Sequence, residues 1–124
     1  MSIVKSKDFF KFGIQEPINR IAYSKEDADY KLMCMKRMQD LGMKIKIDEL
    51  GNITGTLPGN GKTKKKLVIG SHTDSVFNGG QYDGVLGVYS ALAAVESVKE
   101  SHKDRDADVV AVDIDAVIAS EDAE

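Results

Sequence analysis

The stretch LVIGSHTDSVFNGGQYDGVLGVYSALAAVESV, residues 67–98, decides the fold of this chain. It opens with a short apolar run, residues 67–69, that is typical of a strand in a sheet interior. It closes with apolar side chains at helical spacing over residues 85–98, which predicts a helix. The loop between them holds two aspartates and one of the chain's two histidines. Because ligands collect at the carboxyl ends of strands in α/β proteins, this loop is a candidate functional site.

The segments on either side predict the rest of an α/β fold. Upstream, Ser24 and Asp27 form a helix-capping signature, and apolar residues then recur at helical spacing until Gly42. Residues 43–48 alternate apolar and polar side chains, which predicts a strand with one buried face that turns through ELGN into a second strand, ITGTL. Downstream, the apolar run at 109–119 completes a strand, helix, strand unit with parallel strands.

Together these elements predict an α/β protein in which helices pack on a mixed, largely parallel sheet. A further short helix is expected at residues 3–12. A length of 124 residues is enough for one hydrophobic core, so we expect a single domain over residues 1–124.

Composition limits the partners and the location of the protein. Lysine and arginine number 17 against 20 aspartates and glutamates, so the net charge of -3 gives no attraction to a phosphate backbone, and nucleic acid is not expected as a partner. No apolar run is long enough for a membrane span or a secretory signal. The single cysteine, Cys34, excludes an internal disulfide and is expected to pack in the core, so a cytoplasmic location is expected.

The spacing within the loop excludes two familiar sites. A phosphate-binding P-loop needs Gly-Lys-Ser/Thr before the helix, where YDGVLG stands. A calcium loop that began at Asp74 would need an acidic residue twelve positions on, where Val85 stands.

A site for zinc, manganese or cobalt fits the loop better, since imidazole and carboxylate are ligands of these metals. His72 and Asp83 are the candidate ligands. Asp74 is a candidate acceptor for the other imidazole N–H, which would fix the tautomer of the histidine. The alternative from the residues alone is a capped helix start with a surface histidine. The second histidine, His102, lies in a charged segment and is expected at the surface.

The chain resembles a known family over residues 13–98. The segment INRIAYSKEDADYKLMCMKRMQDLGMKIKIDELGNITGTLPG, followed by LVIGSHTDSVFNGGQYDGVLGV, is similar to the opening of the metal-dependent amidohydrolases. These include N-carbamoyl-L-amino-acid hydrolase, allantoate amidohydrolase and beta-ureidopropionase, within the aminoacylase and carboxypeptidase G2 type metallopeptidase family. The resemblance implies a two-metal site in which His72 ligates one ion, Asp83 bridges both and Asp74 has a supporting catalytic role. The reaction implied is hydrolysis of a carbon-nitrogen bond in a small ureido or amide substrate.

The resemblance also implies that parts of the family's enzyme lie outside this chain. Family members supply further ligands, a general-base glutamate and a lid domain from later segments, so this chain would correspond to the N-terminal part of the catalytic domain. The end AVIASEDAE resembles a strand that ends near Ser120 and is followed by paired glutamates, which puts Ala123 at the base position and Glu124 at a ligand position. The alternative is a solvated acidic tail.

Three consequences are expected from the resemblance. Metal occupancy should be partial, because at most three protein ligands are present. The chain alone should be inactive, and it should form a homo-oligomer or bind a complementary segment, because a part of a larger fold leaves apolar surface uncovered. The alternative function is a non-catalytic module that retains the fold for metal binding or association.

Overall fold

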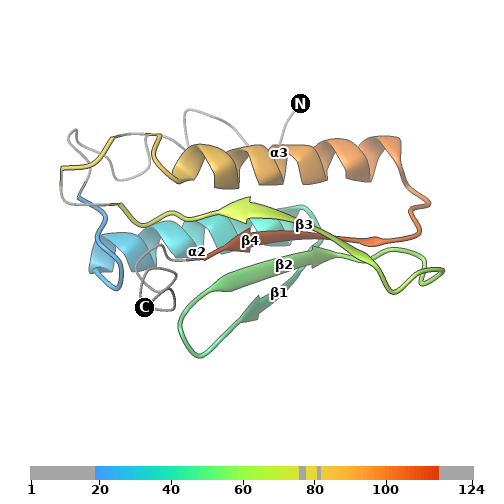
Figure 1. Cartoon of the computed structure of the whole chain (residues 1–124), viewed down its shortest axis with the longest axis horizontal. Helices are drawn as coiled ribbons and strands as arrows, with labels where there is room; N and C mark the ends of the chain where they lie inside the picture. The colour runs from blue at the N-terminus through green and yellow to red at the C-terminus, as the bar shows by residue number, and fades with distance from the viewer. Residues whose placement is uncertain (1–18, 76–77, 81, 115–124) are drawn as a thin grey trace.

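The computed structural model describes residues 19–75, 78–80 and 82–114, and these ranges contain two helices and four strands (Figure 1). In chain order the elements are α2 (Lys25–Asp40), β1 (Lys44–Ile47), β2 (Ile53–Leu57), β3 (Lys66–Ser71), α3 (Val85–Ser101) and β4 (Asp108–Asp113). The helix expected at residues 3–12 lies outside the described residues. Neither helix in these ranges combines the length and the apolar character needed to cross a bilayer.

The four strands form one mixed sheet in the order β1-β2-β4-β3. β1 pairs with β2 and β2 pairs with β4 in antiparallel fashion, whereas β3 and β4 are parallel. Parallel neighbours need a crossover connection, and α3 supplies it. The predicted α/β class, with helices on a mixed sheet, is therefore confirmed, as is the strand, helix, strand unit built around residues 67–98. The sheet is not largely parallel as predicted, because the hairpin strand β2 pairs with β4 and makes two of the three strand pairs antiparallel.

The helix α2 begins and ends as its sequence predicts. The Ser24 side chain accepts a hydrogen bond from the Asp27 amide at 3.1 Å, which satisfies one of the unpaired N–H groups of the first turn. After the helix, Gly42 has a φ of +78°, a conformation that glycine adopts without strain. The inner face of α2 buries Tyr30 and Cys34 completely, so the cysteine packs in the core as expected.

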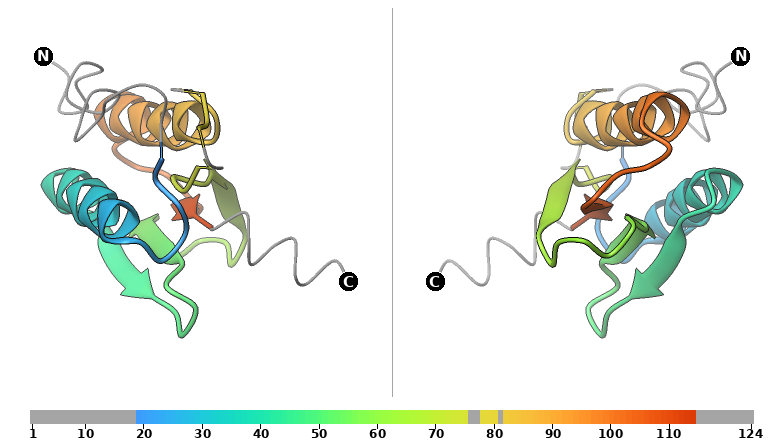
Figure 2. Two further views of the ribbon diagram at one scale, coloured as in Figure 1. Left: turned by 90° about the vertical axis from the view of Figure 1, so that its left-hand side faces the viewer. Right: turned by 90° about the vertical axis from the view of Figure 1, so that its right-hand side faces the viewer.

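Both helices cover the same face of the sheet (Figure 2). α2 packs on β1 and β2, and α3 packs on β3 and β4. The side chains between the helices and the sheet form a single core, and its largest fully buried hydrophobic members are Tyr30, Met38, Leu41, Ile53, Leu92, Val85, Val88 and Val95. The described part of the chain is thus organised around one hydrophobic core.

The two edge strands are less buried than their sequences predict. In β1, Ile45 and Ile47 face the core side of the sheet but remain 36% and 53% exposed. In β3, Leu67 and Val68 are each 56% exposed. The predictions of a buried face for β1 and of an interior position for β3 are therefore wrong. The reason is position in the sheet, since each of these strands pairs with one neighbour and no strand lies beyond it in the described sheet.

Candidate metal centre

The predicted site lies where the chain leaves β3. β3 and β4 run parallel with Ser71 opposite Asp113, so their carboxyl ends lie side by side. The Ile114 amide donates to the Ser71 carbonyl oxygen at 2.9 Å, which continues the pairing just past the end of both strands. His72 follows directly. It therefore occupies the edge of the sheet at which α/β proteins bind their ligands.

His72 and Asp74 contact each other through one ring nitrogen. His72 Nδ1 lies 2.9 Å from the Asp74 carbonyl oxygen and 3.1 Å from Asp74 Oδ1. A neutral imidazole that donates its Nδ1–H to these oxygens presents Nε2 as the ligand atom. The Asp74 side chain is 3% exposed and that of His72 is 23% exposed. This geometry suits a ligand histidine with a supporting carboxylate, and the roles assigned to the two residues stay predictions.

The turn that begins α3 brings Asp83 toward His72. Gly84, the residue at the N-cap of α3, has φ +75° and ψ -49° and packs directly against the imidazole ring. A Cβ atom at this position would come within 2.6 Å of His72 Nε2. Asp83 precedes this glycine and is exposed. The backbone beside Asp83 is therefore in contact with the candidate ligand ring, as the expected bend requires. The proposed bridging role of Asp83 stays a prediction.

The described residues do not complete a metal site. Within them, no group of three or more histidine, cysteine, aspartate or glutamate side chains could hold a metal ion. Glu124, the third predicted ligand, and Ala123, at the predicted base position, lie outside the described residues. β4 ends at Asp113, and the residues that would lead from it to Glu124 also lie outside the described part of the chain, so the placement of Glu124 near His72 stays a prediction.

Sequence reasoning missed a buried arginine behind the loop. Arg20 is 4% exposed, and its Nε donates to the Thr73 carbonyl oxygen at 2.5 Å. Its backbone N–H donates to Ser75 Oγ at 2.8 Å, and the Ser75 amide donates back to the Arg20 carbonyl oxygen at 2.6 Å. Arg20 Cζ lies 4.1 Å from the centroid of the Tyr30 ring, a cation–π contact. Burial lowers the pKa of Arg20 and raises the pKa of the Tyr30 hydroxyl. The loop is thereby attached to the segment that leads into α2.

Sequence reasoning also missed a buried ion pair, Lys31 with Asp113, on the other side of Thr73. Asp113 is fully buried and accepts hydrogen bonds from the Thr73 amide at 2.9 Å and from the Thr73 hydroxyl at 2.8 Å. Lys31 Nζ donates to Asp113 Oδ2 at 3.1 Å and lies 3.6 Å from Asp27 Oδ1. The available sequence signal was weak. Asp113 interrupts an apolar run and Lys31 lies next to the buried face of a helix, where charges are costly unless they are paired.

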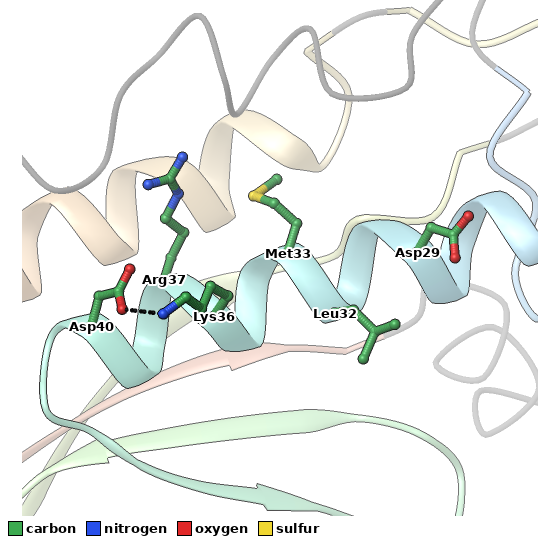
Figure 3. A pocket seen from close by; sticks show the side chains of 6 residues that line it. All are labelled: Asp29, Leu32, Met33, Lys36, Arg37 and Asp40. Carbon is green, nitrogen blue, oxygen red and sulfur yellow. Dashed lines mark hydrogen bonds and ion pairs between the residues drawn. The ribbon is translucent and has the colours of Figure 1, made fainter.

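A surface pocket of about 540 Å³ lies on α2 (Figure 3). Its lining comes from this one helix and consists of Asp29, Leu32, Met33, Lys36, Arg37 and Asp40. Lys36 and Asp40 form an ion pair at 2.8 Å, and Leu32 is 61% exposed. No lining residue belongs to the His72 loop. The pocket is a solvated helix face and adds nothing to the candidate metal centre.

Comparison with known proteins identifies relatives over most of the chain. It is 38% identical over 85 residues to the allantoate amidohydrolase of Bacillus subtilis, a match that covers 68% of this chain and 21% of the relative. It is 36% identical over 85 residues to the N-carbamoyl-L-amino-acid amidohydrolase of a Pseudomonas species, covering 68% of this chain and 20% of the relative. The chain thus spans about a fifth of the length of the curated relatives it matches. No family model matches the chain.

Solved structures agree with these sequence matches. An amidase of the hydantoinase/carbamoylase family from Burkholderia ambifaria superposes with a TM-score of 0.78 at 26% identity, covering 86% of this chain and 26% of the other. A second amidase of that family, from Burkholderia phymatum, gives a TM-score of 0.74 at 30% identity, covering 90% of this chain and 26% of the other. By sequence and by fold, the chain belongs to the amidohydrolase family that includes allantoate amidohydrolase and N-carbamoyl-L-amino-acid amidohydrolase, and it matches the N-terminal part of these proteins.

Proposed function

We propose that this chain contributes His72, Asp74 and Asp83 to a divalent-metal site of an enzyme that hydrolyses carbon-nitrogen bonds in small ureido or amide compounds. The observation that carries the proposal is the setting of His72, whose Nδ1 faces Asp74 while its ring packs against the turn that holds Asp83. The names of the relatives support allantoate or an N-carbamoyl amino acid as the substrate class.

The chemistry of these donors fits a divalent cation such as zinc, manganese or cobalt. An imidazole whose Nδ1 is engaged by a carboxylate presents Nε2 to a metal, and an exposed aspartate beside it adds a charged oxygen ligand. His72 and Asp83 would hold the ion, and Asp74 would keep the proton on His72 Nδ1. A bound metal would supply Lewis-acid polarisation of a substrate carbonyl and activation of water. Because the described residues offer two ligands, we expect weak binding and partial occupancy.

Calorimetric titration of the metal-stripped chain with Zn²⁺ and Mn²⁺ tests this proposal. The variants His72→Ala and Asp83→Ala should each weaken binding at least tenfold, because each removes one of the ligand side chains. His102→Ala is the matched control, since His102 is exposed at the end of α3, and it should bind as the unmodified chain does. Unchanged affinity in His72→Ala would show that the assigned site is wrong.

The second candidate function is a non-catalytic module that binds metal or associates with other proteins. It is favoured by the lack of a three-ligand group among the described residues. Release of ammonia or of an amino acid from allantoate or N-carbamoyl amino acids, abolished by chelator and by Asp83→Ala, would establish the enzymatic function for this chain. Under both candidate functions, the isolated chain is expected to bind metal without hydrolysing substrate. Only the detection of hydrolysis therefore separates the enzyme from the non-catalytic module.

A further inference from the structure

Thr73 lies between His72 and Asp74, two of the three residues of the candidate centre, and each of its polar groups is hydrogen-bonded. Its amide and its hydroxyl both donate to Asp113, at 2.9 Å and 2.8 Å. Its carbonyl oxygen accepts from Arg20 Nε at 2.5 Å. The residue is fully buried. The peptide groups on both sides of Thr73 are therefore fixed in orientation, and they are the groups that connect it to His72 and Asp74.

These contacts divide the loop into an inner side, where Thr73 contacts Asp113, and an outer side, where His72 contacts Asp74. The Thr73 side chain points to the buried Asp113, whereas His72 and Asp74 contact each other. Fixing Thr73 on the inner side therefore fixes the direction in which its two neighbours leave the backbone. A ligand held in this way loses little rotational freedom when it binds a metal.

The inner side is held by charges that are paired within the protein. Asp113 is fully buried and Lys31 has a side chain that is 12% exposed, with 3.1 Å between the Lys31 Nζ and Asp113 Oδ2 atoms. Lys31 Nζ also donates to Thr73 Oγ1 at 3.2 Å. Buried charges are costly to desolvate, and nonpolar side chains of similar volume are often as stabilising. A role beyond stability would account for the presence of this ion pair directly behind the loop.

We propose that Asp113, acting through Thr73 and with Lys31 as its counter-ion, is a positioning residue that orients His72 for metal binding. The inference rests on the proposed function for its ligand, but the orientation of the His72 ring can be measured without a metal. Arg20 holds the Thr73 carbonyl from the opposite side and completes the cluster, which we call the Thr73 clamp (Arg20, Lys31, Thr73 and Asp113).

Two substitutions test the Thr73 clamp. Thr73→Val removes the hydroxyl and keeps the shape and the amide, so it deletes the hydroxyl's hydrogen bond to Asp113 and the one it accepts from Lys31. Asp113→Asn keeps one oxygen for the Thr73 amide and replaces the acceptor shared by Lys31 and the Thr73 hydroxyl with an NH₂ group. Loss of a group that orients a metal ligand typically costs 10- to 100-fold in affinity, and we expect a rise of that size in the dissociation constant for Zn²⁺ in each variant.

The orientation of His72 has its own readout in the metal-free protein. The chain has two histidines, so ¹⁵N spectra of the imidazoles report His72 and use His102 as an internal reference. The Nδ1–H tautomer of His72 should fall in population in Thr73→Val and in Asp113→Asn, because the ring is no longer held against Asp74. The His102 resonances should stay in place.

Two controls separate positioning from general loss of stability. Thr73→Ser retains the hydroxyl and the amide and should bind Zn²⁺ within about twofold of the unmodified chain. Ser24→Ala removes the cap of α2 and lowers the stability of the fold away from the loop, and it should leave the affinity unchanged. Should Asp113→Asn fail to fold, the Thr73→Val and Thr73→Ser pair carries the test alone.

The double variant Lys31→Met/Asp113→Asn supplies a result that a purely structural role does not predict. Asp113→Asn removes the nearer of the two carboxylates that face the Lys31 ammonium and leaves Asp27 at 3.6 Å, so removing Lys31 as well should let the denaturation midpoint partly recover. Affinity for Zn²⁺ should not recover, because the Thr73 hydroxyl still lacks its acceptor. Recovery of both together would overturn the positioning role.

The two proposals fail in distinguishable ways. If the unmodified chain binds no Zn²⁺ or Mn²⁺, the proposed function fails, and the tautomer measurement still decides whether the Thr73 clamp orients His72. If His72→Ala abolishes binding while Thr73→Val and Asp113→Asn bind normally with unchanged His72 spectra, the positioning role alone is overturned.

Discussion

Replacing Gly84 by alanine should damage both the fold and the candidate centre, because this glycine meets two separate constraints. Its φ of +75° with ψ of -49° lies in a region that residues with a Cβ occupy at a cost of about 1–3 kcal/mol. Its α-carbon also packs against the His72 ring. A Cβ would lie 2.6 Å from Nε2, about 0.8 Å closer than the 3.4 Å at which ordinary contact begins.

The collision adds to the backbone strain. Forcing an extra methyl group into a packed site typically costs about 1–3 kcal/mol. We therefore expect Gly84→Ala to lower the free energy of unfolding by about 2–6 kcal/mol, measured by urea denaturation, and to weaken Zn²⁺ binding because the ring has to move. Gly61→Ala is the matched control. Gly61 has a similar φ of +84° with open space where its Cβ would lie, so that variant should show the strain alone and normal metal binding.

A double-mutant cycle isolates the contact with the ring. In a His72→Ala background the added methyl group meets no imidazole, so Gly84→Ala should cost about 1–3 kcal/mol less there than in the unmodified chain. An equal cost in the two backgrounds would show that the His72 ring does not rest on Gly84. The reasoning that places Asp83 beside His72 would then fail with it.

The remaining predictions concern the core, the hairpin and the sheet edge. Leu92→Ala should lower the free energy of unfolding by about 2–5 kcal/mol because Leu92 is fully buried, whereas Leu86→Ala on the exposed face of the same helix should cost less than about 0.5 kcal/mol in the same urea titration. The backbone N–H of Asn52 donates to the Asp48 carboxylate at 2.9 Å and lowers the pKa of Asp48. The ionised Asp48 therefore stabilises the fold at pH values above its ordinary pKa. This stabilisation is lost as the pH falls through the lowered pKa of the folded state. Thermal unfolding from pH 2 to pH 6 should accordingly show the stability gap between the chain and Asp48→Asn closing at the acid end, and a pH-independent gap would contradict the assignment. We further propose that the exposed apolar edge of β3 makes the chain self-associate, in which case Val68→Lys should reduce the mass found by light scattering, and a monomer before substitution would refute the proposal.

The sequence was sufficient where a structure depends on near neighbours along the chain. The cap of α2 is set by Ser24 and Asp27, three residues apart, and it formed as predicted. The proximity of His72 to Asp74 likewise follows from their spacing of two. The crossover of α3 between parallel strands followed from the order of the elements and the shortness of the connections.

The sequence was not sufficient where burial depends on the place of a strand in the sheet. Alternation correctly assigned Ile45 and Ile47 to the core side of β1, but the pattern does not state how many strands lie beyond it. The uninterrupted apolar run of β3 suggested an interior strand for the same reason, and β3 lies at an edge. The end of β4 was misplaced because the apolar run continues in the sequence, whereas β4 itself ends at Asp113.

The contrast between the two ends of β3 shows how the candidate centre is maintained on an exposed strand. At its start, Leu67 and Val68 are more than half exposed and contribute little to the core, whereas Thr73, just past its end, is fully buried. The difference comes from the Thr73 clamp, whose members Arg20 and Asp113 are far apart in the sequence and meet only in the folded chain. The pair His72 and Asp74, which the sequence pattern indicates, is therefore proposed to supply the ligand chemistry, while we propose that its orientation comes from side chains that no local pattern reveals. A centre built in this way depends on the folded domain around it, because a histidine on a strand edge without the clamp would sample many rotamers and bind a metal correspondingly less well.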